Sequence, residues 1–232
     1  MYFQHAESIW EQFPELRAGV LFATGVNTGN AADLAPYFAT ATARLDGKME
    51  SDLPEIQAWR RTFSKMGLKP TQYRCAAESL LRRYRKEGEL PSIHPIIDLC
   101  NAVSLSFALP IAVFDLEHID GGIEVRHAKG DERFDTLGGD VEYPEAGEVV
   151  FVDDGNAAHA RRWSHRQSGS SAVRPGTADI LIVSEALHET AETDLRRLVE
   201  TLATELAGIG ATVHASDILT SDNRRFDFQR TA

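Results

Sequence analysis

The chain has few cysteines, no long apolar run and no recognisable cofactor motif. Cys75 and Cys100 are its two cysteines, too few for the usual thiolate zinc site. No apolar run approaches the ~20 residues that span a bilayer, and the first residues lack the pattern of a secretory signal. The histidines are scattered, and no glycine-rich phosphate loop is present. These absences predict a cytoplasmic protein with reduced cysteines and with no metal, cofactor or membrane partner.

The composition is that of an ordinary globular protein. Hydrophobic residues make up 43% of the 232 residues and charged residues 25%. This length allows one large domain or two small ones. Because there is no internal repeat, low-complexity linker or clean boundary, we expect a single domain over residues 1–232.

The charge is negative overall but unevenly placed. The formal net charge is −11, yet residues 60–86 contain nine basic residues opposed by Glu78 alone, so this segment carries +8 and the remainder −19. Such a segment is either a phosphate-contacting surface or a solvated helix face. The first interpretation predicts RNA contacts from Arg60, Arg61, Lys65, Lys69, Arg82 and Arg83. Glu78 is expected to neutralise Arg74 or Arg82, and a place in a substrate pocket stays open for it.

Hydrophobic periodicity predicts an α+β fold, with helices early and short strands later. The expected helices cover residues 5–16, 31–43, 53–66, 71–85, 95–105 and 189–207. The expected strands cover residues 18–24, 110–115, 123–127, 148–153, 178–183 and 211–215. The polar tail from Thr220 to Ala232 is expected to be loosely held.

Two polar groups of residues stand out against this framework. Asp98, Asn101 and Ser104 lie three apart on the apolar helix, so they form either a satisfied core network or the polar floor of a pocket. Residues 161–171 combine arginines, a tryptophan, a histidine and hydroxyls. They could hold a phosphate, stack on a base and move a proton, or they could form an exposed loop with a few ion pairs.

A resemblance to a known family runs through the middle of the chain. The matching segments are Ser92–Asn101, Leu109-Pro110, Phe114-Asp115, Gly121–Ala128 and Gly130–Phe134. In order and spacing they resemble the editing domain of the phenylalanyl-tRNA synthetase β subunit, the B3/B4 domain. The resemblance covers roughly residues 60–185 and includes no synthetase catalytic or anticodon-binding part. It implies a free-standing, compact α+β domain with mixed short-stranded sheets and flanking helices.

This resemblance implies hydrolysis of a mischarged amino acid from the tRNA acceptor end. Such a reaction needs a positioned water, donors for the oxyanion and a pocket for the wrong side chain. Asn101 and Thr177 match family positions, whereas Ala112 stands where the family often has histidine and the family glutamate falls near Gly169. We therefore expect His165 and Asn101 to be catalytic and the substrate to be bound by Ser104, Arg162, Trp163, Arg166, Thr177 and Glu78.

Two other functions remain open at this stage. The missing histidine and glutamate favour a non-catalytic module that binds a free amino acid, a nucleotide or an RNA end. A small-molecule enzyme unrelated to tRNA could also use the same fold, because fold does not fix function.

Overall fold

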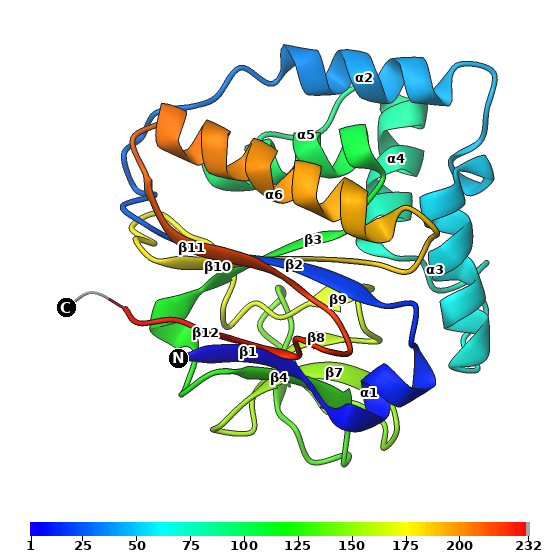
Figure 1. The fold of residues 1–232 in the computed structure, drawn as a ribbon, viewed down its shortest axis with the longest axis vertical. Helices are drawn as coiled ribbons and strands as arrows, with labels where there is room; N and C mark the ends of the chain where they lie inside the picture. The colour runs from blue at the N-terminus through cyan, green and yellow to red at the C-terminus, as the bar shows by residue number, and fades with distance from the viewer. Residues whose placement is uncertain (231–232) are drawn as a thin grey trace.

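The computed structural model describes residues 1–230, which form two packed sheets with helices covering one of them (Figure 1). The middle layer is an antiparallel four-stranded sheet. Its order is β11 (Thr212–Leu219), β2 (Arg17–Thr24), β10 (Ile180–Ala186) and β3 (Ile111–Asp115).

The second sheet has six strands and packs below the first (Figure 1). Its order is β12 (Arg225–Asp227), β1 (Tyr2–His5), β4 (Ile123–His127), β7 (Val149–Asp153), β8 (Ala158–Arg161) and β9 (Arg166–Gln167). Strands β1 and β4 are parallel, and the other neighbours are antiparallel. A separate two-stranded hairpin pairs β5 (Phe134–Asp135) with β6 (Val141–Glu142).

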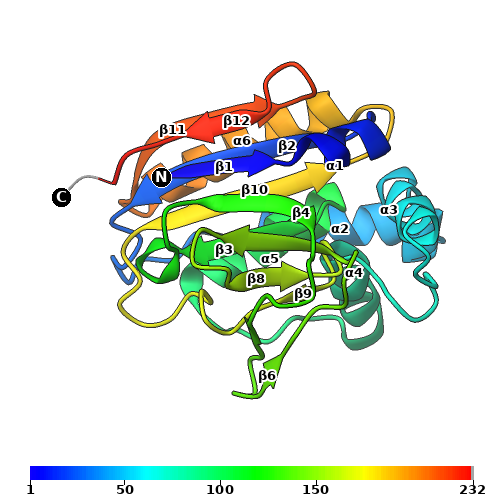
Figure 2. The same cartoon turned by 90° about the horizontal axis from the view of Figure 1, so that it is seen from below.

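The helices lie on the outer face and at one end of the four-stranded sheet. Helices α5 (Pro95–Phe107) and α6 (Ala191–Gly208) pack on that face, and α2 (Ala35–Leu45) packs on α5. Helices α3 (Pro54–Lys65) and α4 (Ala76–Glu87) lie together at one end (Figure 2). The short α1 (Glu7–Gln12) follows β1, and two 3-10 turns span Glu50–Asp52 and Leu116–His118.

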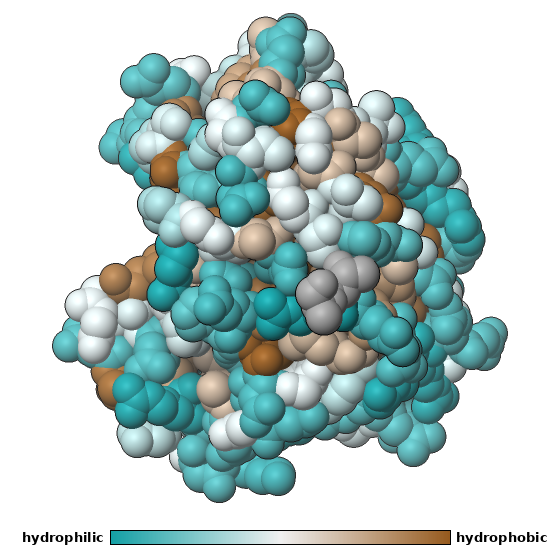
Figure 3. Space-filling view, turned by 90° about the vertical axis from the view of Figure 1, so that its left-hand side faces the viewer, coloured by the Kyte–Doolittle hydropathy of each residue, from teal (hydrophilic) through white to brown (hydrophobic). Residues whose placement is uncertain are grey.

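Two hydrophobic cores lie on opposite sides of the four-stranded sheet. Side chains alternate between the faces of a strand, so Val20 and Phe22 of β2 join the core between the sheets, whereas Leu21 and Ala23 join the core beneath the helices. A strand that is buried on both faces must be apolar throughout. This explains why residues 18–24 read as a continuous apolar run. The opposite end of the molecule from α3 presents mostly hydrophilic side chains (Figure 3).

The expected fold class is confirmed, with two corrections to the elements. Residues 5–16 are not one helix, because Tyr2–His5 form β1 and α1 begins at Glu7. The tail is not loosely held where it is described. Strand β12 pairs with β1, Phe226 and Phe228 are each 6% exposed, and the Phe228 amide donates to the Met1 carbonyl at 3.0 Å. The last two residues of the expected tail, 231 and 232, lie outside the described residues.

Candidate functional site

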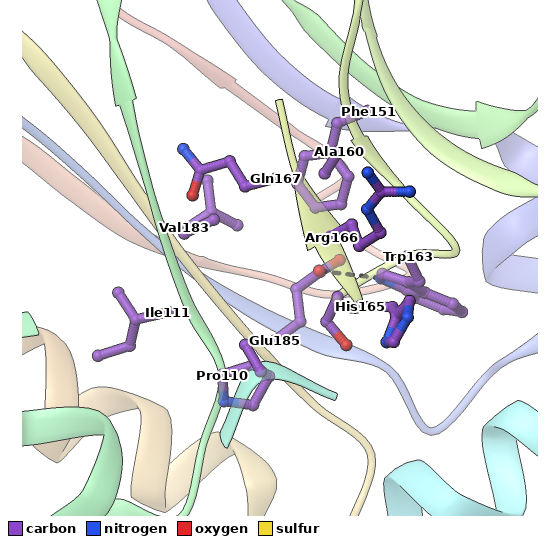
Figure 4. A pocket seen from close by; sticks show the side chains of 13 residues that line it. Pro110, Ile111, Phe151, Ala160, Trp163, His165, Arg166, Gln167, Val183 and Glu185 are labelled. Atoms are coloured by element: carbon purple, nitrogen blue, oxygen red, sulfur yellow. Dashed lines mark hydrogen bonds between the residues drawn. The ribbon is translucent and has the colours of Figure 1, made fainter. Parts of the chain in front are cut away.

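A small cavity of about 60 Å³ lies between the two sheets. Strands β3 and β10 line it from the four-stranded sheet, and β7, β8 and β9 line it from the six-stranded sheet (Figure 4). Its walls are mainly apolar, with a few polar side chains. The lining residues with functional groups are Trp163, Ser164, His165, Arg166, Gln167 and Glu185.

The loop between β8 and β9 places His165 at the cavity wall. Arg162 and Trp163 both adopt left-handed backbone conformations, with φ of 47° and 56°, which cost about 1–3 kcal/mol each in a residue other than glycine. Burial of the Trp163 ring against Trp59 and Phe13 offsets this strain. The turn thus sends Trp163 into the core while His165 borders the cavity.

His165 is held as a neutral base. Its Nδ1 lies 2.8 Å from the Arg74 carbonyl oxygen, which can only accept, so Nδ1 carries the proton and Nε2 keeps its lone pair. The Arg74 amide N–H also points at Nδ1, at the longer distance of 3.4 Å, so the tautomer is assigned from the shorter contact. Burial lowers the pKa of His165 below 6.5, and the nearby charges of Arg162 and Arg166 lower this pKa further. The hydrogen bond to Arg74 raises the pKa but does not outweigh these effects. His165 can therefore accept a proton at neutral pH.

A buried carboxylate, Glu185, also lines the cavity. Its Oε1 lies 2.6 Å from His5 Nε2, and its Oε2 accepts the Trp163 indole N–H at 2.9 Å (Figure 4). The sequence analysis missed this residue because the expected strand ended at residue 183. An acidic residue in the largely apolar run Ile180–Ala186 was the available signal.

Three expected site residues meet at this cavity, and Arg162 lies beside it. His165, Trp163 and Arg166 line the wall. The Arg166 guanidinium is 2.9 Å from Glu142. Arg162 does not line the cavity, and its guanidinium stacks on the Tyr73 ring at 4.9 Å.

Four other expected residues, Asn101, Ser104, Thr177 and Glu78, are not among those that line the His165 cavity. Asn101 borders a separate pocket with Asp98, beneath α2. The buried Ser104 hydroxyl donates to the Leu109 carbonyl at 2.5 Å, at the end of α5. The buried Thr177 hydroxyl donates to Asp115 at 2.7 Å. Ser104 and Thr177 thus satisfy buried polar groups locally.

The structure gives a physical reason for the unusual residue at each of the two family positions. Ala112 lines the cavity, so its methyl group leaves space where a larger side chain would project. Gly169 lies against the β5–β6 hairpin, where an added Cβ would be 2.8 Å from the Thr136 carbonyl oxygen. A side chain at position 169 would displace this backbone, and Gly169 is not among the residues that line the cavity.

Two buried glutamates neutralise part of the basic segment. Glu78 lies 2.5 Å from Arg60 and 3.6 Å from Arg74, which excludes a solvent-facing role. Glu50 pairs with Arg85 at 2.8 Å and with Arg82 at 3.6 Å. The expected pairing of Glu78 with Arg74 is therefore present, whereas Arg82 faces Glu50 instead.

The remaining expected RNA-binding residues differ in how free they are. Arg83 pairs with Glu87 at 2.8 Å, and the Lys65 ammonium bonds the Gln12 carbonyl. Arg61 and Lys69 are exposed and have no carboxylate within 4.0 Å among residues 1–230. These two cations are the freest of the predicted set for contact with phosphate.

Comparison with known proteins defines the family. The B3/4 domain family model matches residues 58–206; the chain belongs to the B3/4 domain family. It is similar to the phenylalanine–tRNA ligase β subunit of Shewanella oneidensis, with 28% identity over 148 residues that cover 63% of this chain and 18% of the relative. The corresponding subunit of Nocardia farcinica is 34% identical over 103 residues, covering 44% of this chain and 12% of the relative. The resemblance predicted from the sequence is confirmed.

The match covers only a small part of these relatives, since the chain spans less than a fifth of their length. Among solved structures, an N-terminal fragment of the phenylalanyl-tRNA synthetase β subunit from Pyrococcus horikoshii aligns with a TM-score of 0.43 and 15% identity. The alignment covers 51% of this chain and 41% of that one. In residues 1–230, no helix combines the length and apolar character needed to cross a membrane.

Proposed function

We propose that the protein hydrolyses a mischarged aminoacyl-tRNA ester in trans, with the amino acid held in the cavity between the sheets. The observation that carries this proposal is the neutral His165 on the wall of that cavity. Membership of the B3/4 family and similarity to tRNA ligase subunits support tRNA as the partner. A cytoplasmic location, where charged tRNA is found, remains part of the same proposal.

In the proposed reaction a water molecule attacks the ester carbonyl carbon. His165 Nε2 takes a proton from that water and gives it to the tRNA ribose oxygen as the acyl carbon–oxygen bond breaks, which releases the free amino acid and the tRNA. Arg166 bonds Glu142 through one guanidinium nitrogen. Its other N–H groups are left to stabilise the negative charge that develops on the carbonyl oxygen. The Trp163 ring is buried, so its role is to hold the loop between β8 and β9 in place.

The tRNA backbone would cross the end of the molecule formed by α3 and α4. Arg61 and Lys69 would provide most of the phosphate contact, since buried glutamates neutralise Arg60 and Arg82. Asn101 has no part in this reaction, because it borders a separate pocket.

A non-catalytic binding module is the second candidate. It is favoured by Ala112, which leaves the cavity wall without a polar side chain at that position. It is also favoured by Glu185, whose two oxygens are already bonded to His5 and Trp163. Such a module would bind an amino acid or an RNA end without turning it over.

Single-turnover deacylation of a panel of correctly and wrongly charged tRNAs tests the proposal. We expect acceleration over spontaneous hydrolysis for at least one mischarged tRNA, and a loss of about 10²–10⁴-fold in His165→Gln, the usual contribution of a general base. His127→Gln is the matched control, because His127 Nδ1 also bonds a backbone carbonyl, that of Gly147 at 3.2 Å, outside the cavity. Binding of tRNA without acceleration across the panel would favour the binding module.

A further inference from the structure

A second cluster of polar side chains shares no residue with the cavity between the sheets. Glu55 comes from the first turn of α3, His188 from the segment after β10, and Asp194 from the first turn of α6. One potential ligand atom from each residue lies within 4.8 Å of the other two. Three distant parts of the chain therefore bring an imidazole and two carboxylates together.

Two buried acceptor atoms in this cluster lack a donor. His188 Nε2 is 2.9 Å from Asp194 Oδ2, so Nε2–H donates to the carboxylate and Nδ1 keeps its lone pair. His188 Nδ1 and Glu55 Oε2 are buried and have no hydrogen-bond partner within residues 1–230. The residues are only 8% and 7% exposed. Buried acceptors of this kind need a donor or a cation.

We propose that Glu55, His188 and Asp194 bind a divalent transition-metal ion of the Zn²⁺ type. One imidazole nitrogen and carboxylate oxygens form a normal zinc ligand set, whereas Ca²⁺ and Mg²⁺ prefer oxygen ligands alone. Three protein ligands leave a position for water. Arg44 lies 2.6 Å from Glu55 and Arg197 lies 3.9 Å from Asp194, so two arginines balance the charge of the two carboxylates.

Outer hydrogen bonds already orient both carboxylates. Arg44 donates to Glu55 Oε1 at 2.6 Å, which leaves Oε2 for the ion. The Thr190 hydroxyl donates to Asp194 at 2.6 Å. Such outer contacts are characteristic of metal sites, where they fix the ligand geometry.

An ion can reach the cluster from solvent, and the distances between the ligand atoms need to shorten only slightly to bind it. His188 lines a surface pocket together with Arg17, Leu187 and Glu192, so an ion can reach it from solvent. Zinc–ligand bonds of ~2.0–2.2 Å place tetrahedral ligands roughly 3.4 Å apart. The ligand atoms now lie within 4.8 Å of each other and approach this spacing by side-chain rotation. Because Nδ1 and Nε2 point away from each other, an ion shared with Asp194 binds Nε2 in place of its proton, which moves to Nδ1.

Calorimetric titration of the metal-stripped protein with Zn²⁺ tests this proposal. We expect one equivalent to bind, and at least a tenfold loss of affinity in both Glu55→Gln and His188→Gln. His118→Gln is the matched control, because Asp115, Glu117 and His118 also lie within 4.8 Å of one another but Glu117 and His118 are exposed. The control should bind as the unsubstituted protein does.

Anomalous scattering at the zinc edge, from crystals of the unsubstituted protein, gives a test that no folding defect can obscure. The expected peak lies between Glu55 and His188. Absence of saturable binding, a peak at another place, or a bridging water at this position would overturn the proposal. Loss of binding in His118→Gln with full binding in His188→Gln would overturn it as well.

Discussion

Trp163 joins the core and the candidate site through a single hydrogen bond. Its indole N–H is one of two groups bonded to the buried Glu185 carboxylate. Trp59 is equally buried, but its indole N–H has no partner within residues 1–230. Comparing substitutions of the two tryptophans therefore distinguishes the contribution of the hydrogen bond to stability from the contribution of ring burial.

We predict that Trp163→Phe destabilises the protein more than Trp59→Phe does, by about 1–3 kcal/mol, because only the first leaves a buried carboxylate oxygen without its donor. Urea denaturation of both variants measures the difference in the free energy of unfolding. Equal losses would mean that the bond to Glu185 contributes no net stability.

The lowered pKa of His165 predicts a dependence of stability on pH. Between the folded pKa and the unfolded value near 6.5, the unfolded chain binds more protons, so stability rises with pH in this window and is lost as the pH falls through it. We expect the His165 ring to titrate below 6.5 by NMR. In His165→Gln, the increase in unfolding free energy across this window should be smaller. A ring that titrates above 6.5 would contradict both expectations.

Sequence reasoning identified part of the site at this scale. Residues 161–171 stood out by composition, and His165 and Arg166 do line the cavity. The burial of Trp163 could not be predicted, because it depends on Trp59, Phe13 and Glu185, which are distant in sequence. Asn101 and Ser104 lie on the same helix but have different surroundings. Asn101 borders a pocket, whereas the Ser104 hydroxyl bonds the Leu109 carbonyl at the end of the helix.

At the scale of elements, the longer helices and strands followed from periodicity, whereas the short strands β1 and β12 did not. The helix expected over residues 189–207 is α6, and its leucines form a buried stripe. Strand β1 has four residues and becomes a strand only through pairing with β4 and β12, which are far away in sequence. No local pattern can report such partners, so the first strand and the tail strand were missed.

The ordered tail predicts a stability effect. Phe228→Ala should destabilise the protein by about 3 kcal/mol or more, the usual cost of deleting a buried aromatic ring. Tyr143→Ala, at a side chain that is 58% exposed, should change stability by less than about 0.5 kcal/mol. Thermal and urea unfolding check both. A tolerated Phe228→Ala would show that packing of the tail after β12 contributes little to stability.

The basic end of the molecule predicts a charge effect on tRNA binding. Reversing Arg61 and Lys69 to glutamate should lower tRNA affinity at least tenfold and reduce its dependence on salt concentration, because phosphate contacts release counterions. Arg196→Glu with Lys129→Glu changes the net charge equally at exposed sites on other elements. Filter binding at several salt concentrations compares the pairs, and equal effects would rule out a specific contact surface.

At the scale of the whole molecule, the two cysteines report on the two cores. Cys75 belongs to the core between the sheets and Cys100 to the core beneath the helices. Burial raises the pKa of each thiol to about 12, so neither reacts while folded. Because the four-stranded sheet is part of both cores, we expect them to unfold together.

Thiol labelling of Cys75→Ser and Cys100→Ser under native conditions measures this. Each variant keeps one thiol, and we predict that labelling of both thiols is slowed by the same factor, within about threefold, as expected for global unfolding. A difference above tenfold would reveal that one core opens separately.

The position of the cavity between the sheets has a practical consequence for finding its ligand. Strands β3 and β10 form one wall and β7, β8 and β9 the other, so a bound molecule would join two layers that separate on unfolding. Any such molecule raises the melting temperature, since a ligand at 100 times its dissociation constant adds about 2.7 kcal/mol of stability. A melting-temperature screen of amino acids, nucleotides and their esters could therefore identify the occupant without an assay for turnover.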